Sequence, residues 1–303
     1  MKKPVAMNQP ELSLTIREAY QQHLFRQQGI MLCKQLISLV IEIQKHRGCT
    51  LAILSGDHFF ETQLYGIQRD ITDKLRQLDT APSALLQASD RDQIIQEWVC
   101  LRRLWRKDTV QENFLLHSNL IAGLLKTIWQ VTHRARLTGI SETQDTLVTF
   151  CMRDWLHMIE TSAQARGLAT HVAVCRSARS DIRSRIRFLY EQMRALDRTF
   201  IEHLDDFEAR HSTRIKEATE RADYRQQLDT FLKQLSLHFC ETDKPNIDAD
   251  SIYTLGSHLV SACQIVLLAA IKLIEKTLSP ELAAWVDGDD HPPENDSTIL
   301  PMD

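Results

Sequence analysis

The stretch "IEIQKHRGCTLAIL" (residues 41–54) combines an apolar helical stripe with an arginine and a glycine. Steps of three or four residues from Arg47 meet Ile43 on one side and Leu51 on the other, a spacing that places all three on one face of a helix. Gly48, which follows, is a poor helix former. The pattern therefore predicts a buried helix in which Arg47 occupies a position typical of leucine.

The sequence around this stretch also favours helices. No proline lies between Pro82 and Pro245, and no segment shows the sustained apolar–polar alternation of a strand. Thr109–Glu112 and Ser141–Gln144 have the form of capping boxes, in which a hydroxyl and a later Glu or Gln satisfy backbone N–H groups at a helix start. We therefore predict an all-α fold. The expected helices lie near residues 11–27, 30–55, 58–79, 89–106, 110–136, 142–176, 180–211, 213–240 and 249–278.

The segment "RLTGISE" around Gly139 divides the chain into halves of similar helical content. Long helices with short connections are typical of antiparallel bundles, so we predict two antiparallel four-helix bundles packed together. The breaks near Gly29 and Ser212 are the weakest, and each is compatible with one continuous helix. The predicted units are an N-terminal helical segment (1–29), a first bundle (30–139), a second bundle (140–279) and an acidic, disordered tail (280–303).

Composition narrows the class of protein. The chain has 303 residues, 43% of them hydrophobic, and a net charge of −4, so it can bury a core but shows no nucleic-acid footprint. The seven cysteines form no C-x-x-C motif, which favours reduced thiols in a cytosol. The N-terminus lacks the apolar segment of a secretory signal. We therefore expect a cytoplasmic protein that does not bind nucleic acid directly.

The longest apolar run is "LVSACQIVLLAAIKLI" (residues 259–274). It is shorter than the roughly 18 residues that a membrane span requires, and it contains Gln264 and Lys272. A buried core helix is therefore favoured over a membrane span, which stays as the less favoured alternative, and we expect no membrane association.

The second half of the chain repeats the arginine–glycine pair. In "MIETSAQARGLATHVAV" (residues 158–174), Arg166 shares a helix face with Ile159 and Ala173, and Gly167 follows it. Small neighbours, including Ser162, leave space beside this arginine for a small polar ligand. Glutamines that can donate amide hydrogen bonds accompany both pairs: Gln44 and Gln164.

Two interpretations of the inward arginines are open. Each can extend its head to solvent or pair with a carboxylate from a neighbouring helix. Alternatively, both can hold a bound anion, because an unpaired buried cation is costly and the planar fork of a guanidinium suits a planar oxyanion.

At these residues the sequence resembles the NIT domain, the nitrate- and nitrite-sensing domain of bacterial regulators. "LVIEIQKHRGCTLAIL" and the following "TQLYGIQRDITDKLRQL", with its Thr72-Asp73 pair, are similar to the first block of the family. "IETSAQARGLATHV" is similar to the second block. The chain departs from the family pattern at His46 and Ala165, where the family usually has Glu, and at Gly167, where Ala is common.

The resemblance implies an all-helical sensor with two four-helix bundles and a nitrate or nitrite site between them. The arginines contributed by the two bundles would be Arg47 and Arg166. The residues expected around them are Gln44, His46, Gly48, Thr50, Ser162, Gln164 and Gly167. The family's domains are usually fused to an output module, and none is recognisable here, so we expect signalling through a homodimer or a protein partner.

Two other classes of function are alternatives to a sensor. A helical interaction scaffold would use Arg47 and Arg166 as structural groups. A di-iron enzyme needs two Glu-x-x-His motifs, and the chain has one, Glu208–His211. No other catalytic or phosphate-binding motif occurs. We therefore expect no enzymatic activity, no cofactor and no metal site.

Overall fold

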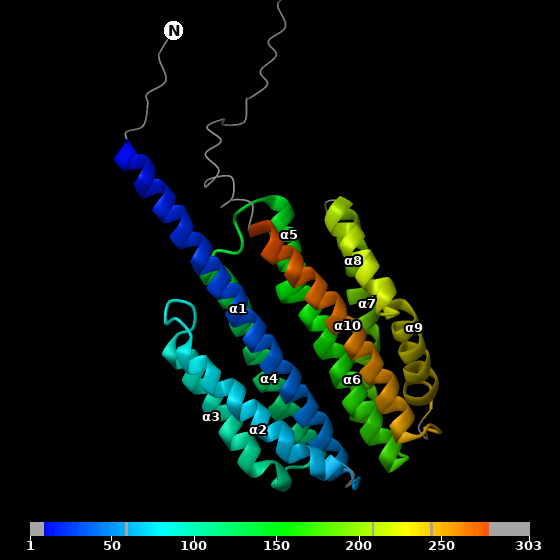
Figure 1. Cartoon of the computed structure of the whole chain (residues 1–303). Helices are drawn as coiled ribbons and strands as arrows, with labels where there is room; N and C mark the ends of the chain where they lie inside the picture. The colour runs from blue at the N-terminus through cyan, green and yellow to red at the C-terminus, as the bar shows by residue number, and fades with distance from the viewer. Residues whose placement is uncertain (1–8, 58–59, 208, 243–244, 279–303) are drawn as a thin grey trace, which may run out of the picture.

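A computed structural model, which describes residues 9–57, 60–207, 209–242 and 245–278, shows an all-α protein, as predicted (Figure 1). No strand occurs in those ranges. The helices are α1 (Gln9–Leu54), α2 (Glu61–Gln77), α3 (Ala88–Leu104), α4 (Val110–Arg134), α5 (Glu142–Thr149), α6 (Trp155–Cys175), α7 (Ser180–Asp206), α8 (Ala209–Arg221), α9 (Tyr224–Leu235) and α10 (Ala249–Leu278). A π-helical segment, Phe150–Asp154, joins α5 to α6.

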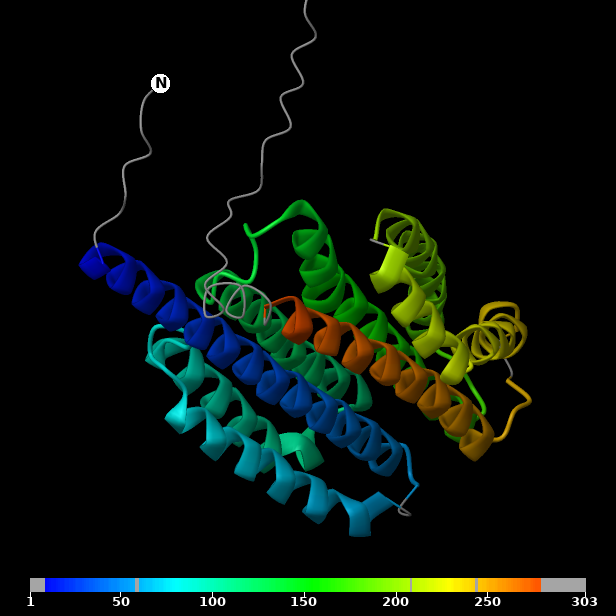
Figure 2. The same ribbon diagram turned by 45° about the horizontal axis from the view of Figure 1, so that its top comes forward.

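The helices lie in two groups that follow the order of the chain (Figures 1 and 2). Helix α1 packs along α4 and α2, and α3 packs on α4. In the second group α10 packs on α6, α8 and α9, and α7 packs on α6. Contacts between α1 and α6 join the groups, and one continuous cluster of buried apolar side chains runs through α1, α4, α6 and α10.

This shared core includes residues from both of the predicted bundles. The description as two four-helix bundles, with boundaries at 30–139 and 140–279, stays a prediction, because the larger cluster contains buried apolar residues of both halves. The N-terminal segment 1–29 is described from residue 9, as the start of α1. The predicted disordered tail, residues 280–303, lies outside the described residues.

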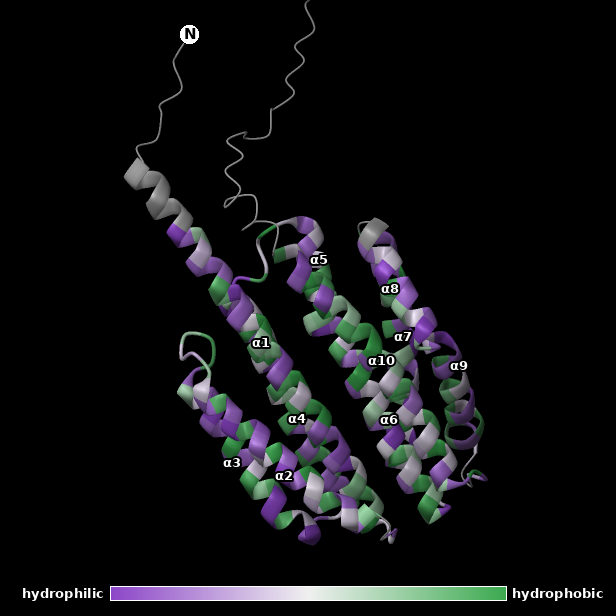
Figure 3. Ribbon diagram, in the orientation of Figure 1, coloured by the Kyte–Doolittle hydropathy of each residue, from purple (hydrophilic) through white to green (hydrophobic). Residues whose placement is uncertain are grey.

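Helix α10 is rich in apolar residues (Figure 3), and many of them are buried. Among the helices that the structure describes, it is long and apolar enough to cross a membrane. Half of its most apolar stretch is buried inside the protein, through residues such as Leu259, Val266 and Ile274. A core helix of a soluble protein passes the same test of length and composition, so we keep the interpretation of α10 as a core helix.

The structure has no break at either of the two weakly predicted positions, Gly29 and Ser212. Helix α1 runs through Gly29 without interruption, and the buried Gly29 lies where α1 meets Ala135 at the end of α4. The chain does not break at Ser212, which lies inside α8. Its breaks fall instead near Phe207, which follows α7, and at Asp223, whose φ of 49° is left-handed.

Replacing Gly29 by alanine is expected to destabilise the fold by about 1–3 kcal/mol, because the added methyl group would collide with the Cβ of Ala135. Gly123, in α4, is the matched control, since it is exposed and nothing lies within 4 Å of an added Cβ. Alanine there should stabilise the helix by up to about 1 kcal/mol. Urea midpoints at unchanged m-value measure both effects; equal effects at the two glycines would contradict the packing argument.

The predicted capping signals are largely present. Thr109 and Glu112 form a complete capping box at the start of α4, with Glu112 N donating to Thr109 Oγ1 at 3.2 Å and Thr109 N to Glu112 Oε2 at 2.8 Å. At α5, Ser141 Oγ accepts from Gln144 N at 3.2 Å. These caps fix where the helices on either side of the central loop begin.

All seven cysteines are free, as expected for reduced thiols. Cys33, Cys49, Cys151 and Cys263 are buried and fill small spaces in the core. Burial raises the pKa of the Cys33 thiol to about 12, so this group stays protonated and unreactive.

Candidate functional site

Arg47 is buried in the middle of the helices, where α1 meets α4 and α6. Its side chain is 1% exposed. Its guanidinium forms a two-pronged ion pair with Glu160 on α6, with Nη1 to Oε1 at 2.6 Å and Nη2 to Oε2 at 3.1 Å. Nη1 also donates to Ser118 Oγ on α4 at 3.1 Å. The charge of Arg47 is therefore compensated by a carboxylate of the protein itself.

Glu160 is the centre of this polar cluster. Besides Arg47, its carboxylate accepts from Gln44 Nε2 on α1 at 2.8 Å and from Gln164 Nε2, one turn further along α6, at 2.8 Å. Arg185 on α7 donates to Gln164 Oε1 at 3.0 Å. A buried carboxylate is tolerated when it is paired and hydrogen-bonded, so the two predicted glutamines hold Glu160 in place.

Arg166 is buried as well, but its surroundings differ. It is 6% exposed, and no carboxylate among the described residues lies within ion-pair distance of it. Nη1 donates to Ser257 Oγ on α10 at 3.1 Å, and the guanidinium lies 5.1 Å from the ring centroid of Tyr253. Nε is buried without a hydrogen-bond partner. Burial, and to a smaller extent the charge of Arg47, lower the pKa of Arg166 from its usual value.

Helix geometry explains why Glu160 serves one arginine. Glu160 and Arg166 are six residues apart, so they point about 120° apart around the axis of α6. Glu160 faces α1 and α4, whereas Arg166 packs on α10, with its head beside Gly48 of α1. The site thus holds two cations and one carboxylate and lacks one negative charge.

The glycines next to the arginines have separate structural roles. An added Cβ at Gly48 would lie 3.8 Å from Arg166 Nη2, so the first arginine–glycine pair borders the head of the second arginine. An added Cβ at Gly167 would meet Leu51 Cδ1 at 3.2 Å, where α6 packs on α1. Gly256 was not singled out from the sequence; a Cβ there would lie 2.7 Å from Arg166 Cβ and Cγ. Gly256 therefore lets α10 lie directly on the stem of Arg166.

His46 belongs to a second buried polar group, between α1, α2 and α4. His46 Nδ1 lies 2.8 Å from His117 Nε2, and His46 Nε2 lies 3.1 Å from Gln68 Nε2. His117 Nδ1 lies 2.7 Å from the carbonyl of Asn113. Burial, followed by the charge of Arg102, lowers the pKa of His46 to about 3. Burial and the neighbouring His46 lower the pKa of His117 well below its usual value.

These two histidines predict a loss of stability on acidification. Below about pH 6.5 both rings are protonated in the unfolded chain but not in the folded chain. The unfolded state therefore binds more protons, and the free energy of unfolding decreases as the pH is lowered. The contribution of the two neutral histidines to stability is complete above pH 6.5 and is lost progressively towards pH 3. For His46 alone the loss by pH 5 is about 2 kcal/mol. Urea unfolding of the parent and of His46→Gln at pH 7.5 and 5 measures it; parallel pH dependences would contradict the assignment.

The remaining predicted site residues lie further from the arginine heads. Thr50 Oγ1 donates to Asn113 Oδ1 on α4 at 2.7 Å and back to the carbonyl of His46. Ser162 Oγ lies 3.5 Å from Met193 Sδ, so it faces α7 and neither arginine. The structure thus brings Arg47, Gln44 and Gln164 together around Glu160 and places Thr50 and Ser162 elsewhere.

A groove of about 390 Å³ leads from the surface to this cluster, between α4 and α6. Ser118, Glu160 and Gln164 lie in its lining, together with the basic or titratable side chains of Lys126, Arg153 and His157. The groove therefore connects the buried carboxylate to solvent past positive charge.

Sequence reasoning missed Glu160, Tyr253 and Ser257. A signal for Glu160 was available, since it is the single acidic residue between Asp154 and Asp181 and lies in an apolar helix. The partners from α10 carry no such signal, because ordinary Tyr and Ser residues become partners of Arg166 through packing alone. Glu208 of the Glu-x-x-His motif lies outside the described residues, and no cluster of three potential metal ligands occurs within them.

The fold also occurs in a protein of known structure. No family model and no curated protein matches the sequence. Among solved structures, the chain is similar to the NasR transcription antiterminator, with a TM-score of 0.65 and 16% sequence identity over 89% of this chain and 74% of that chain. At this level of identity the likeness shows a shared fold.

Proposed function

We propose that the protein is a cytoplasmic sensor that binds nitrate or nitrite beside Arg166 and Arg47. One observation carries the proposal: Arg166 is buried without a carboxylate partner in the described part of the chain, and its Nε is unsatisfied. An uncompensated buried cation costs several kcal/mol. The resemblance to the NIT domain and the fold shared with a transcription antiterminator support a regulatory role.

The charge of the site favours a monoanion. Arg47 and Arg166 contribute two positive charges and Glu160 one negative charge, which leaves one positive charge to balance. Nitrate and nitrite each carry one negative charge and planar oxygens that match the donors of a guanidinium. A dianion such as sulfate would leave the buried site negative.

Signalling requires a conformational equilibrium that the anion shifts. A ligand shifts such an equilibrium by its differential affinity for the two states. We propose that the anion, held by Arg166, draws Arg47 partly away from Glu160 and so changes how α1 packs against α6. A homodimer or a protein partner would read that change. Light scattering and partner pull-down profiles should therefore differ with and without saturating nitrate, and identical profiles would rule out this route.

The alternative function is a helical interaction scaffold with structural arginines. The Arg47–Glu160 pair favours this alternative, because an internal carboxylate already neutralises the charge of Arg47, as in a structural ion pair. The scaffold does not account for Arg166. We also propose that the chain binds its ligand without catalysing a reaction and without a cofactor.

Isothermal titration with nitrate, nitrite, chloride and sulfate at equal ionic strength tests the proposal. We expect saturable binding of nitrate or nitrite and none of sulfate. The variant Glu160→Gln raises the uncompensated buried charge from one to two, so it should bind the anion more tightly. Absence of saturable binding of both nitrate and nitrite, or equal binding of sulfate, would refute the proposed ligand class.

A further inference from the structure

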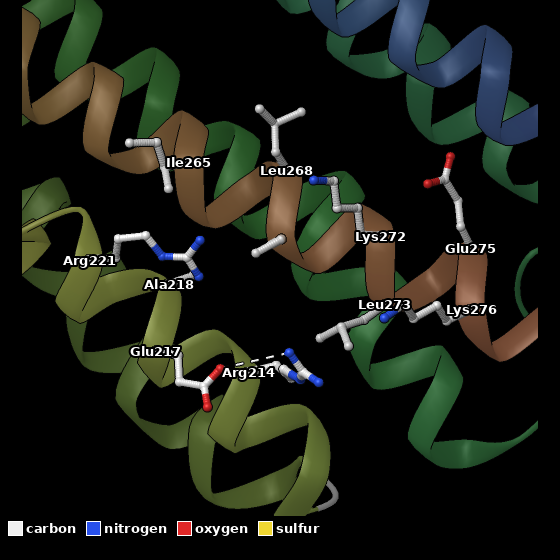
Figure 4. A pocket seen from close by; sticks show the side chains of 11 residues that line it. Arg214, Glu217, Ala218, Arg221, Ile265, Leu268, Lys272, Leu273, Glu275 and Lys276 are labelled. Atoms are coloured by element: carbon white, nitrogen blue, oxygen red, sulfur yellow. Dashed lines mark ion pairs between the residues drawn. The ribbon is translucent and has the colours of Figure 1, made fainter.

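A second groove, of about 560 Å³, lies between α8 and α10 (Figure 4). Its floor is apolar and open to solvent, with Leu268 53% and Ile265 42% exposed. Large apolar side chains that line an exposed groove commonly mark a binding surface. This groove is separate from the arginine site, because none of its lining residues contacts Arg47 or Arg166.

The rim of the groove is basic. Arg214 and Arg221 come from α8, and Lys272 and Lys276 from α10 (Figure 4). The two carboxylates at the rim already have basic partners. Glu217 lies 4.0 Å from Arg214, and Glu275 pairs with Lys34 of α1 at 2.9 Å.

Three of these cations are left for an incoming ligand. Arg221, Lys272 and Lys276 have no ion-pair partner among the described residues. A matching ligand would therefore carry several negative charges beside apolar side chains.

The chain itself contains such a segment. Residues 279–303, "SPELAAWVDGDDHPPENDSTILPMD", follow α10 directly and contain no Lys or Arg. Their acidic residues are Glu281, Asp287, Asp289, Asp290, Glu294, Asp296 and Asp303. The apolar group Leu282–Val286 comes immediately before the densest acidic stretch, Asp287–Asp290. The order of apolar and acidic residues thus matches the floor and the rim of the groove.

The segment can reach the groove. Leu268 lies ten residues before the end of α10, which is about 15 Å along the helix axis. Trp285 is seven residues beyond Leu278 and spans up to about 24 Å when extended. A chain that turns back after α10 can therefore place Trp285 over Leu268 and its acidic residues beside Lys272 and Arg221.

We propose that residues 279–303 dock in the groove between α8 and α10, with Leu282–Val286 on the apolar floor and Asp287–Asp290 at the basic rim. Docking buries Leu268 and Ile265 and compensates the three rim cations. The attraction has an electrostatic part at the surface, so it weakens with added salt.

Cross-linking of the full chain with a carbodiimide, which joins a lysine amine to a contacting carboxylate, tests the proposal. An equimolar mixture of ¹⁴N- and ¹⁵N-labelled chains separates links within one chain from links between copies. We expect links from Lys272 and Lys276 to Asp287–Glu294 within one chain, at least tenfold above links from the exposed Lys126 of α4. Predominance of mixed-isotope links would assign the groove to a second copy and overturn the proposal.

Lys276 is close to the acidic segment in sequence, so it can form links even without docking. A variant that disrupts the groove is therefore compared with the parent. The double substitution Arg221→Glu and Leu268→Asp changes exposed positions and keeps both reporter lysines. It should lower the yield of the links at least tenfold, and the matched exposed substitution Arg69→Glu on α2 should leave the yield unchanged. Equal yields in the parent and the double variant would overturn the proposal.

Discussion

Replacing Arg47 by methionine is expected to cost about 3–5 kcal/mol of unfolding free energy, because Glu160 would stay buried without its cation. Glu160 is 6% exposed and receives two charge-assisted hydrogen bonds from Arg47. Without nitrate this loss arises from the stranded carboxylate alone. In saturating nitrate it should be larger, because the variant site has no unbalanced positive charge and so also loses the stabilisation by the anion. Urea unfolding in nitrate-free buffer and in saturating nitrate measures it.

Two controls make this result specific. Arg76 and Asp73 form a surface ion pair at the same distance, 2.6 Å, but the side chain of Arg76 is 72% exposed. Arg76→Met should therefore cost at most about 1 kcal/mol. In the second control, Arg47→Met with Glu160→Gln removes the stranded charge and should recover part of the loss. A cost at Arg47 no larger than that at Arg76 would show that the ion pair is not buried in solution.

The fold class could be predicted from the sequence, because helix formation depends on the local spacing of apolar residues and on the positions of proline and glycine. The scarcity of proline and glycine and the caps at Thr109 and Ser141 predict helices independently of tertiary packing. Gly29 shows the limit of that reasoning. A glycine in a helical pattern indicates either a break or a close approach of another backbone, and here Ala135 of a distant helix decides for the second. The breaks near Phe207 and Asp223 carry no proline or glycine, so the sequence has no breaker that indicates them.

The site was predicted in part. Helical spacing placed Arg47 and Arg166 on inward faces, and both side chains are buried. The spacing does not show which neighbouring helix each one faces. Arg47 meets Glu160, whereas Arg166 meets Ser257 and Tyr253, which lie about ninety residues further along the chain. Partners at that separation depend on how α10 packs against α6, which no local pattern of residues contains.

The two arginines consequently play unequal parts. The pair of Arg47 with Glu160 is a structural contact that joins α1 to α6, and its removal should unfold the protein more readily under all conditions. Arg166 has no comparable contact and raises the energy of the anion-free state, because its charge is buried and uncompensated. The substitution at Arg166 should therefore remove the ligand response without lowering the stability of the anion-free protein, whereas the substitution at Arg47 should lower that stability.

Replacing Arg166 by methionine is expected to abolish the stabilisation by nitrate while leaving the anion-free protein as stable as the parent or more stable. In the parent, nitrate at 100 times its dissociation constant should stabilise the fold by about 2.7 kcal/mol. For a chain of this size that corresponds to a rise of several degrees in Tm. The variant loses the group that carries the unbalanced charge and the unsatisfied Nε, so it gains nothing from the anion. Thermal unfolding with nitrate, chloride and sulfate at equal ionic strength measures the response.

The variant Arg166→Lys tests whether the response to nitrate depends on the positive charge alone or also on the planar guanidinium. Lysine keeps the positive charge but lacks the planar fork of donors, so it should retain a weaker response that discriminates less between nitrate and chloride. In the scaffold interpretation Arg166 is a structural group, and its loss should lower Tm in every buffer without changing the response to nitrate. A nitrate-specific rise in Tm that survives in Arg166→Met would therefore exclude Arg166 as the anion-binding group, because no ligand can stabilise the fold through a side chain that is absent.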